Sequence, residues 1–138
     1  MKKMYFLTVL LIAAIVIVFL LFSCDEDELA KEFLSGYGIC TEQKPYSAED
    51  FIIPEEFDSY YDSYNMMQME SNLNLSPYKG KRAVRRTYRI TNFFKDFDGE
   101  VFANVIFVNR RPVAGDINCP TLDGFILPLS YMLTKGTK

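Results

Sequence analysis

The chain has 138 residues, 49% of them hydrophobic, and a mean hydropathy of +0.01, which is enough apolar content for a packed core and excludes intrinsic disorder. It carries 15 basic and 18 acidic residues, a formal net charge of −3 at pH 7, and no histidine. The lack of histidine excludes Ser–His and Cys–His catalysis as well as histidine-based metal sites. We therefore predict no catalytic residue, no metal site and no cofactor.

The N-terminal segment 1–24 has the features of a membrane-targeting leader. Lys2 and Lys3 precede a stretch without charge that runs from residue 4 to residue 22, and four acidic residues follow at 25–28. Crossing a bilayer takes roughly 20 apolar residues, whereas the apolar core of a signal peptide has about 7–15. The stretch is therefore long for a signal peptide and sufficient for a transmembrane helix. Lysines favour the cytoplasmic side, so residues 25–138 are predicted to form one small extracytoplasmic domain.

The end of this leader resembles the lipobox of bacterial lipoproteins. In that pattern the peptide is cut before a cysteine that then carries the lipid, and Leu21-Phe22-Ser23-Cys24 places Cys24 at that position. Two alternatives stay open: a lipoprotein with its lipid on Cys24, or an uncleaved transmembrane anchor. Both would hold the domain 25–138 at the extracytoplasmic face of the cell membrane.

Two helices are predicted in the exported domain. The first covers 25–35, with acidic residues in its first turn and Gly36 at its end. The second begins at Pro54 and ends at Asn72 or Asn74. Its helical spacing predicts one buried stripe, which consists of Phe57, Tyr60, Tyr61, Tyr64 and Met67. This spacing favours core packing of the tyrosines over a sugar-stacking role.

The remaining segments predict strands. Short strands are expected at 39–44 and 51–53, and longer ones at 82–92, 101–108 and 112–117. The segment 101–108 is apolar on both faces apart from Asn104, which indicates a central strand, and 121–133 is expected to pack across the sheet. The sequence therefore predicts an α+β fold with two helices packed on an antiparallel sheet of three to five strands.

Two cysteines, Cys40 and Cys119, fall within the exported domain. An oxidising exterior permits a disulfide between them, and two buried free thiols are the alternative. A catalytic cysteine is not expected, because no histidine is present to activate it.

The charges of the domain are segregated along the chain. Residues 25–70 carry 2 basic and 13 acidic side chains, whereas residues 71–95 carry 7 basic and no acidic ones. The basic block gives a candidate interaction surface: Lys79, Lys81, Arg82, Arg85, Arg86 and Arg89. It is interpreted either as internal pairing with the acidic helices or as contact with anionic lipid or wall polymer. Strand alternation would place Arg85 and Arg89 on one face and Arg82 and Arg86 on the other. An acidic exported domain is not expected to bind nucleic acid.

Motifs for other chemistry are weak. The segment 96–100 lacks the ligand spacing of a calcium loop, and Lys79-Gly80-Lys81 lacks that of a phosphate-binding loop. Asp116 and Asp123 are the best carboxylate pair for acid–base chemistry, but each lies beside a glycine, which is typical of turns.

Several short motifs resemble a family of small membrane-anchored proteins of spore-forming Gram-positive bacteria, known as a domain of unknown function. The resemblance spans most of residues 30–127 and covers Phe33-Leu34, Gly36-Tyr37-Gly38, Tyr64-Asn65, Gln68, Leu73, Leu75-Ser76-Pro77-Tyr78, Gly80, Asn92, Asn104, Gly115-Asp116 and Asp123-Gly124-Phe125. It implies a location and a fold and supplies no catalytic residue.

The sequence thus favours a membrane-tethered, non-enzymatic interaction or sensory module. A small inhibitor-like or envelope-polymer-binding domain is the first alternative, and a carboxylate-dependent enzyme is the second. The expected partners are the membrane, through the leader, and an envelope protein or anionic polymer.

Overall fold

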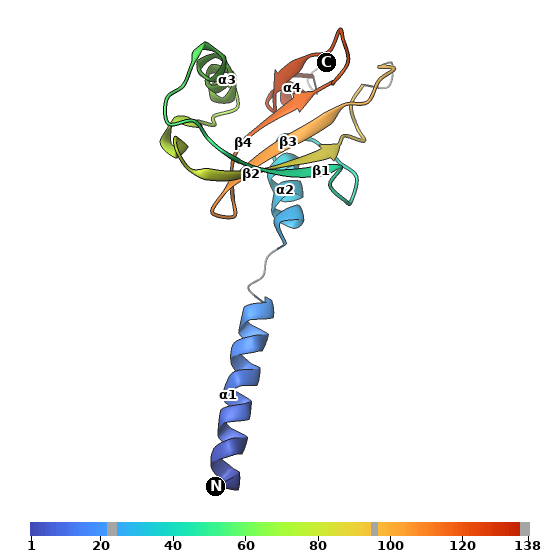
Figure 1. The fold of residues 1–138 in the computed structure, drawn as a ribbon. Helices are drawn as coiled ribbons and strands as arrows, with labels where there is room; N and C mark the ends of the chain where they lie inside the picture. Colours follow the sequence, from blue (N-terminus) through green and yellow to red (C-terminus); the bar gives the residue numbers. More distant parts are fainter. Residues whose placement is uncertain (22–24, 95–96, 136–138) are drawn as a thin grey trace.

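A computed structural model describes residues 1–21, 25–94 and 97–135 of the chain, without the side chains of 19–21. Within these ranges four α-helices, a short 3-10 helix and five strands follow one another (Figure 1). In chain order they are α1 (Lys2–Leu21), α2 (Glu26–Ser35), β1 (Ser47–Ile52), α3 (Ser59–Glu70), η1 (Ser76–Tyr78), β2 (Arg82–Arg89), β3 (Phe102–Val108), β4 (Arg111–Asn118), β5 (Ile126–Pro128) and α4 (Tyr131–Lys135). The predicted α+β class is confirmed.

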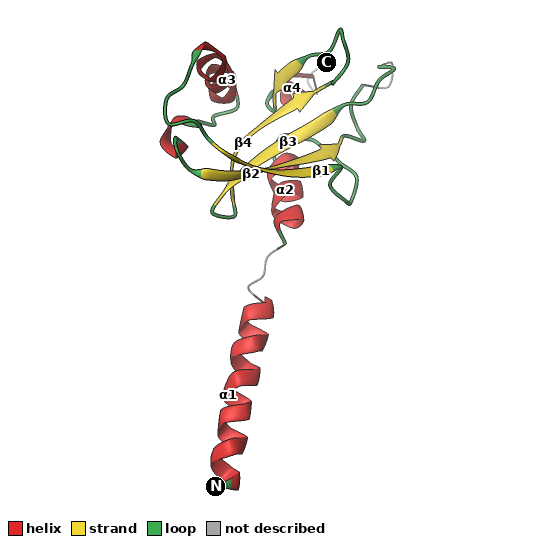
Figure 2. Cartoon of the chain, viewed as in Figure 1, coloured by secondary structure: helices red, strands yellow, loops and turns green. Residues whose placement is uncertain are grey.

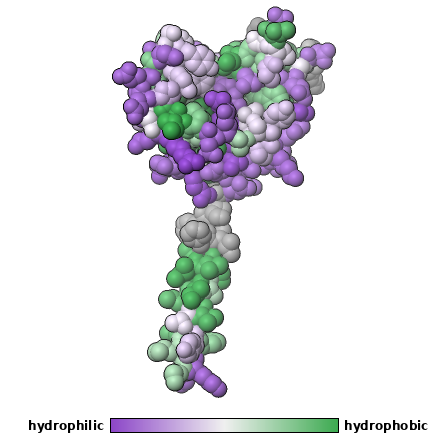
Figure 3. Space-filling model, viewed as in Figure 1, coloured by the Kyte–Doolittle hydropathy of each residue, from purple (hydrophilic) through white to green (hydrophobic). Residues whose placement is uncertain are grey.

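The first helix, α1, stands apart from the folded domain (Figure 1). Every side chain of residues 1–18 is exposed, and the space-filling view in Figure 3 shows hydrophobic side chains along much of this helix. No helix in the described part of the chain is both long enough and apolar enough to cross a membrane. Cys24, the predicted lipidation site, lies outside the described residues.

The five strands form one antiparallel sheet in the order β1-β2-β3-β4-β5, so each strand pairs with its neighbours in sequence. The turn between β3 and β4 has positive φ at Asn109 and Arg110, 49° and 61°, the geometry that matches the twist of a tight hairpin. All seven residues of β3 are buried, as predicted for a central strand.

Helix α2 covers one face of the sheet. The Asp25 side chain accepts a hydrogen bond from the backbone of Asp27 at the helix start, and Gly36 is the C-cap, as predicted. Its fully buried Ala30 and Leu34 pack in a cluster with alternate residues of the strands, among them Val105 and Tyr88. Burial of this face is therefore the main hydrophobic contribution of α2.

Two partly buried ion pairs fix the start of α2 to the same face. Arg86 of β2 lies 2.9 Å from Asp27 and 3.0 Å from Glu26, and all three side chains are 22–23% exposed. The hydroxyl of Tyr88 also donates to Asp27, at 2.6 Å. Burial, and then the hydrogen bond to Asp27, raise the pKa of Tyr88. The acidic start of α2 thus has a specific partner in the basic block.

Helix α3 and η1 cover part of the opposite face, so the strands lie between α2 and α3 (Figure 2). The Asp58 side chain accepts from the backbone N–H of Tyr61, which starts the helix at Ser59 rather than at the predicted Pro54. Asn72 has the predicted left-handed conformation just after its end, with φ of 58°. The second core cluster contains Ile53, Leu75 and Ile106, with Phe57 packed against it.

The predicted stripe on this helix is confirmed in part, because Phe57, Tyr61 and Tyr64 are partly buried against the second core cluster. Tyr60 is 62% exposed, whereas the fully or nearly buried residues are the polar Asn65 and Gln68. Asn65 accepts a hydrogen bond from the backbone N–H of Leu75 at 2.6 Å and donates to Asn74 and Ser76. These bonds hold the segment 74–76 against α3. The buried face of α3 therefore binds through hydrogen bonds as well as apolar contact.

Of the two alternatives for Cys40 and Cys119, the structure has free thiols and no disulfide, with Cys119 buried as that alternative expects and Cys40 exposed. The strand expected at 39–44 is present only as an isolated bridge between Thr41 and Ile90. This bridge lies on the side of β2 that faces away from β3. Cys119 follows β4, so the lines of β2 and β3 separate the two cysteines. Three strand spacings amount to about 14 Å, and a disulfide requires Cα atoms within about 7 Å.

Candidate functional site

A row of polar side chains crosses the sheet on the face that α3 only partly covers. Ser47, Thr87, Asn104 and Asp116 are direct cross-strand partners on β1, β2, β3 and β4. Residues paired in this way point to the same face of a sheet. We call these four residues the polar row.

Three members of the polar row and Tyr64 form a connected chain of hydrogen bonds. Thr87 donates to Asn104 Oδ1 at 2.7 Å, and Asn104 Nδ2 donates to Asp116 Oδ1 at 2.9 Å. From α3, the Tyr64 hydroxyl donates to Asp116 Oδ2 at 2.7 Å. Both carboxylate oxygens of Asp116 thus have fixed donors, which orients the side chain.

A small pocket of about 110 Å³ opens above this chain. It has Asp116, Asn104 and Asn118 in its lining, together with Arg85 and the aromatic rings Phe51, Tyr60, Tyr61 and Tyr64. A shallower depression of about 340 Å³ shares Arg85, Asn104 and Asn118 with this pocket and extends to Tyr46, Glu49 and Glu100. We call the two together the sheet groove.

Burial dominates the electrostatics at the floor of the sheet groove. Asp116 is 4% exposed, and desolvation raises the pKa of its carboxyl group although hydrogen bonds from Tyr64 and Asn104 oppose the rise. Burial, and then the charge of Asp116, raise the pKa of Tyr64 well above its usual value. Tyr64 therefore stays protonated at neutral pH and acts as a donor to Asp116.

This burial predicts a pH dependence of stability. Because the folded pKa of Asp116 is raised above the unfolded value of 3.8, the stabilisation linked to its protonation is complete below pH 3.8 and is lost as the pH rises through the folded pKa. Urea unfolding from pH 3 to 7 is expected to show this loss in the wild type and not in Asp116→Asn. Asp123→Asn, at an exposed position, controls for the removal of one charge. Identical pH profiles for the wild type and Asp116→Asn would contradict the assignment.

The basic block is divided between the two faces, as strand alternation predicts. Arg86 faces α2, whereas Arg85 lines the sheet groove and lies 3.5 Å from Glu49. Arg82 and Arg89 lie 3.6 Å from Asp50 and 2.8 Å from Glu100, respectively. All four arginines thus have acidic partners, and pairing with an acidic helix is found for Arg86.

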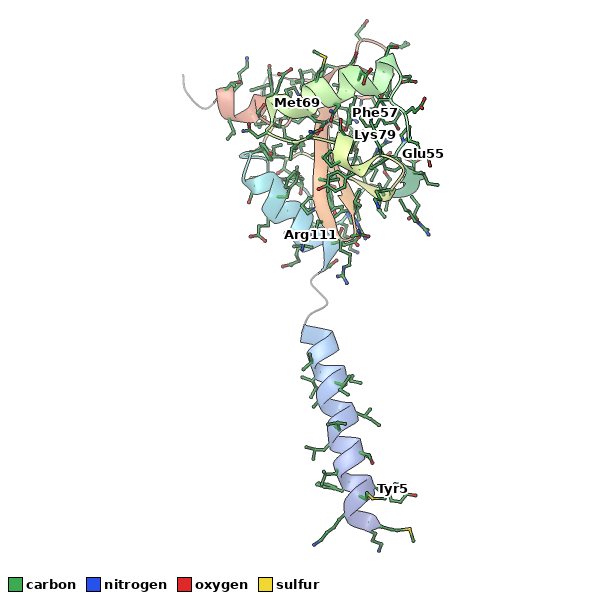
Figure 4. All side chains as sticks on the ribbon, turned by 90° about the vertical axis from the view of Figure 1, so that its left-hand side faces the viewer. Tyr5, Glu55, Phe57, Met69, Lys79 and Arg111 are labelled. Atoms are coloured by element: carbon green, nitrogen blue, oxygen red, sulfur yellow. The ribbon has the colours of Figure 1, made fainter. Side chains whose placement is uncertain are left out.

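The two lysines of the block are exposed and lie away from the sheet groove. The ammonium group of Lys79 lies 4.4 Å from the centroid of the Phe57 ring. Figure 4 shows Lys79 and Phe57 beside Glu55. Lys81 is likewise exposed. The six residues therefore do not form one continuous cationic surface.

The two candidate carboxylates are in different environments. Asp116 is buried in the sheet groove, whereas Asp123 is exposed in the loop between β4 and β5 and does not line either part of that groove. In the described ranges, no three acidic or cysteine side chains gather closely enough to hold a metal ion. The groove nevertheless offers donors, acceptors and aromatic rings in one place.

Gln68 of α3 also supports this floor and was missed as a site residue. Its Oε1 accepts from the backbone N–H of Gly115 at 2.9 Å, next to Asp116. The clue in the sequence is that Gln68 follows Asn65 by three residues and Tyr64 by four, which places it beside both on the helix surface. From the sequence alone, a polar helix face of this kind is interpreted as exposed to solvent.

A scan against protein-family models, a search of curated proteins and a search of solved structures each found no match to this chain. The family resemblance described above therefore stays a prediction. Several residues that carry it do meet in the structure, because Tyr64, Gln68, Asn104, Gly115 and Asp116 all lie at or beneath the floor of the sheet groove.

Proposed function

We propose that the chain is a membrane-tethered extracytoplasmic module that binds a ligand of the cell envelope, without catalysis, through the sheet groove. The observation that carries the proposal is the oriented hydrogen-bond chain from Thr87 through Asn104 to Asp116, held from above by Tyr64. Burying a polar group costs stability unless the group is hydrogen-bonded. A few polar side chains held in fixed positions in the lining of a pocket are a feature of ligand-binding sites.

The tether is supported by the sequence of the leader. Two lysines, an uncharged stretch and an acidic run precede the domain, and Cys24 ends a lipobox-like motif. Every residue of the two buried core clusters lies between Ala30 and Leu129. The leader therefore contributes no residue to these core clusters, which is consistent with a role in locating the domain.

Fractionation and lipid labelling test the location. The full-length chain is expected in the membrane fraction, accessible to protease added to spheroplasts, and labelled by a fatty-acid probe that is lost in Cys24→Ala. Cys40→Ala, which removes an exposed cysteine of the domain, is the matched control. Full-length protein recovered in the cytosol would refute the location, whereas an unlabelled protein in the membrane fraction would refute only the lipid.

Sedimentation with isolated cell envelopes tests the binding role. The detergent-solubilised full chain is expected to sediment with envelopes, and Asn118→Ala is expected to reduce this by about tenfold, the loss typical of one ligand hydrogen bond. Arg82→Ala is the control, because Arg82 is 80% exposed and lies on the other face of β2. Equal sedimentation of Asn118→Ala and the wild type would place binding elsewhere.

The alternative function is a carboxylate-dependent enzyme, and activity assays test it. Asp116 and Tyr64 would be its reacting groups, because they are the buried titratable pair in the pocket. Hydrolase assays on envelope material are expected to show no turnover. Turnover that is lost in Asp116→Asn and kept in Asp123→Asn would overturn the non-catalytic role.

A further inference from the structure

We infer that the ligand of the sheet groove is a neutral saccharide, an inference that rests on the proposed function and adds the chemistry of the ligand. The first step concerns the backbone. The strands β1 to β4 are paired across the floor of the groove, with one register shift in β3 between Ile106 and Phe107. Their N–H and C=O groups lie in the plane of the sheet and are engaged there, so they are not offered to a ligand above it.

Recognition must therefore come from side chains, and those available suit hydroxyl groups. Thr87 keeps its acceptor lone pairs after it donates to Asn104, and Asn104 uses one of its two amide N–H groups on Asp116. Asn118, whose side chain also hydrogen-bonds Asp116, adds a second amide, and Ser47 adds a hydroxyl within the same groove. A ligand that is both donor and acceptor at closely spaced positions matches this lining, as the hydroxyls of a sugar ring do.

This lining disfavours an extended peptide. Peptides that bind sheets add a strand at a free edge and use main-chain hydrogen bonds, whereas the groove lies on a face. A peptide anchor residue would also need an apolar pocket, but Asp116, Asn104 and Asn118 lie in the lining of the small pocket.

Aromatic rings stand where the faces of sugar rings would lie. Tyr46 is 65% exposed at the shallow end and packs on Phe102 with ring centroids 4.8 Å apart. Tyr60 is 62% exposed at the pocket end. Exposed rings with a fixed orientation offer apolar faces at low entropic cost, and the apolar faces of a pyranose pack on such rings.

The charge of the groove disfavours an anionic ligand. Arg85 and Arg89 each have a carboxylate partner, Glu49 and Glu100, and Asp116 adds a further acidic group. The site thus has no excess of positive charge to attract an anionic polymer or nucleic acid. Among the described residues no acidic cluster suits a metal ion either.

The test uses the ¹⁵N-labelled full chain in detergent micelles and a tetramer of N-acetylglucosamine as the neutral probe. Saturable shifts are expected for the side-chain amides of Asn104 and Asn118. Tyr46→Ala and Asn118→Ala are each expected to weaken binding by about tenfold. Arg82→Ala is expected to leave it unchanged, since Arg82 lies on the other face. Thermal unfolding of each variant checks that the fold is intact.

Two comparison probes make the inference falsifiable. The deacetylated glucosamine tetramer is cationic and the galacturonic acid tetramer is anionic, and both are expected to bind at least tenfold more weakly than the neutral probe. Tighter binding of a charged tetramer, or no shift at about 10 mM neutral tetramer, overturns the inference. If Asn118→Ala still loses envelope sedimentation in that case, the proposed function stands and only the saccharide is wrong.

Discussion

Replacement of Leu34 with alanine is expected to lower the free energy of unfolding by about 3–4 kcal/mol. Leu34 of α2 is 0% exposed and belongs to the core cluster between that helix and the sheet. Its truncation removes apolar contact and leaves a cavity that a continuous β-sheet cannot close by small shifts. Urea unfolding followed by tyrosine fluorescence measures the change, because the chain has 9 tyrosines and no tryptophan.

Leu122→Ala is the control for this substitution. Leu122 is 107% exposed, so its truncation is expected to change the free energy of unfolding by less than about 0.5 kcal/mol. A loss below about 1 kcal/mol in Leu34→Ala would show that α2 is not packed on the sheet as described.

Replacement of Gly115 with alanine is expected to destabilise the domain by about 2–4 kcal/mol and to disturb the sheet groove. An added Cβ would lie 2.6 Å from the carbonyl oxygen of Asn104 and 2.9 Å from Leu129 Cδ1. The carbonyl belongs to the central strand and cannot move without breaking the β3–β4 pairing. Since Gly115 adjoins Asp116, the same shift would displace the carboxylate from Tyr64 and Asn104.

The matched control is Gly99→Ala. Its Cβ would lie 2.7 Å from Phe97 Cε1, which is the end of a half-exposed side chain that can rotate away. Urea unfolding is expected to show a change below about 1 kcal/mol there. If Gly115→Ala unfolds at the same urea concentration as the wild type, the close approach of β4 to β3 is not as described.

The sequence predicted the elements whose local signals agree with their tertiary environment. The acidic start and glycine end of α2, and the apolar run of β3, act at short range and need no knowledge of the partner. The strands expected at 101–108 and 112–117 leave only a short gap, which favours a hairpin, and its turn lies at Asn109 and Arg110. These features indicate the fold class.

The site could not be predicted in the same way. Tyr64, Asn104 and Asp116 are spread over 52 residues, and only strand register and the position of α3 bring them together. The helix spacing predicts that Tyr60 and Tyr64 share a buried face, but Tyr60 is exposed and the polar Gln68 is fully buried. Its burial depends on a free backbone N–H at Gly115, which is a property of the sheet edge and not of the helix sequence.

The strand order has a consequence for how the domain forms. In a meander each strand meets the one made just before it, so β3 and β4 close over a turn of only two residues, whereas β1 reaches β2 only after the 29 residues that contain α3 and η1. Closing a longer loop costs more chain entropy, and contacts close in sequence speed folding. We therefore expect the β3–β4 hairpin to nucleate the domain and the docking of α3, with the closure of the sheet groove, to be the last step.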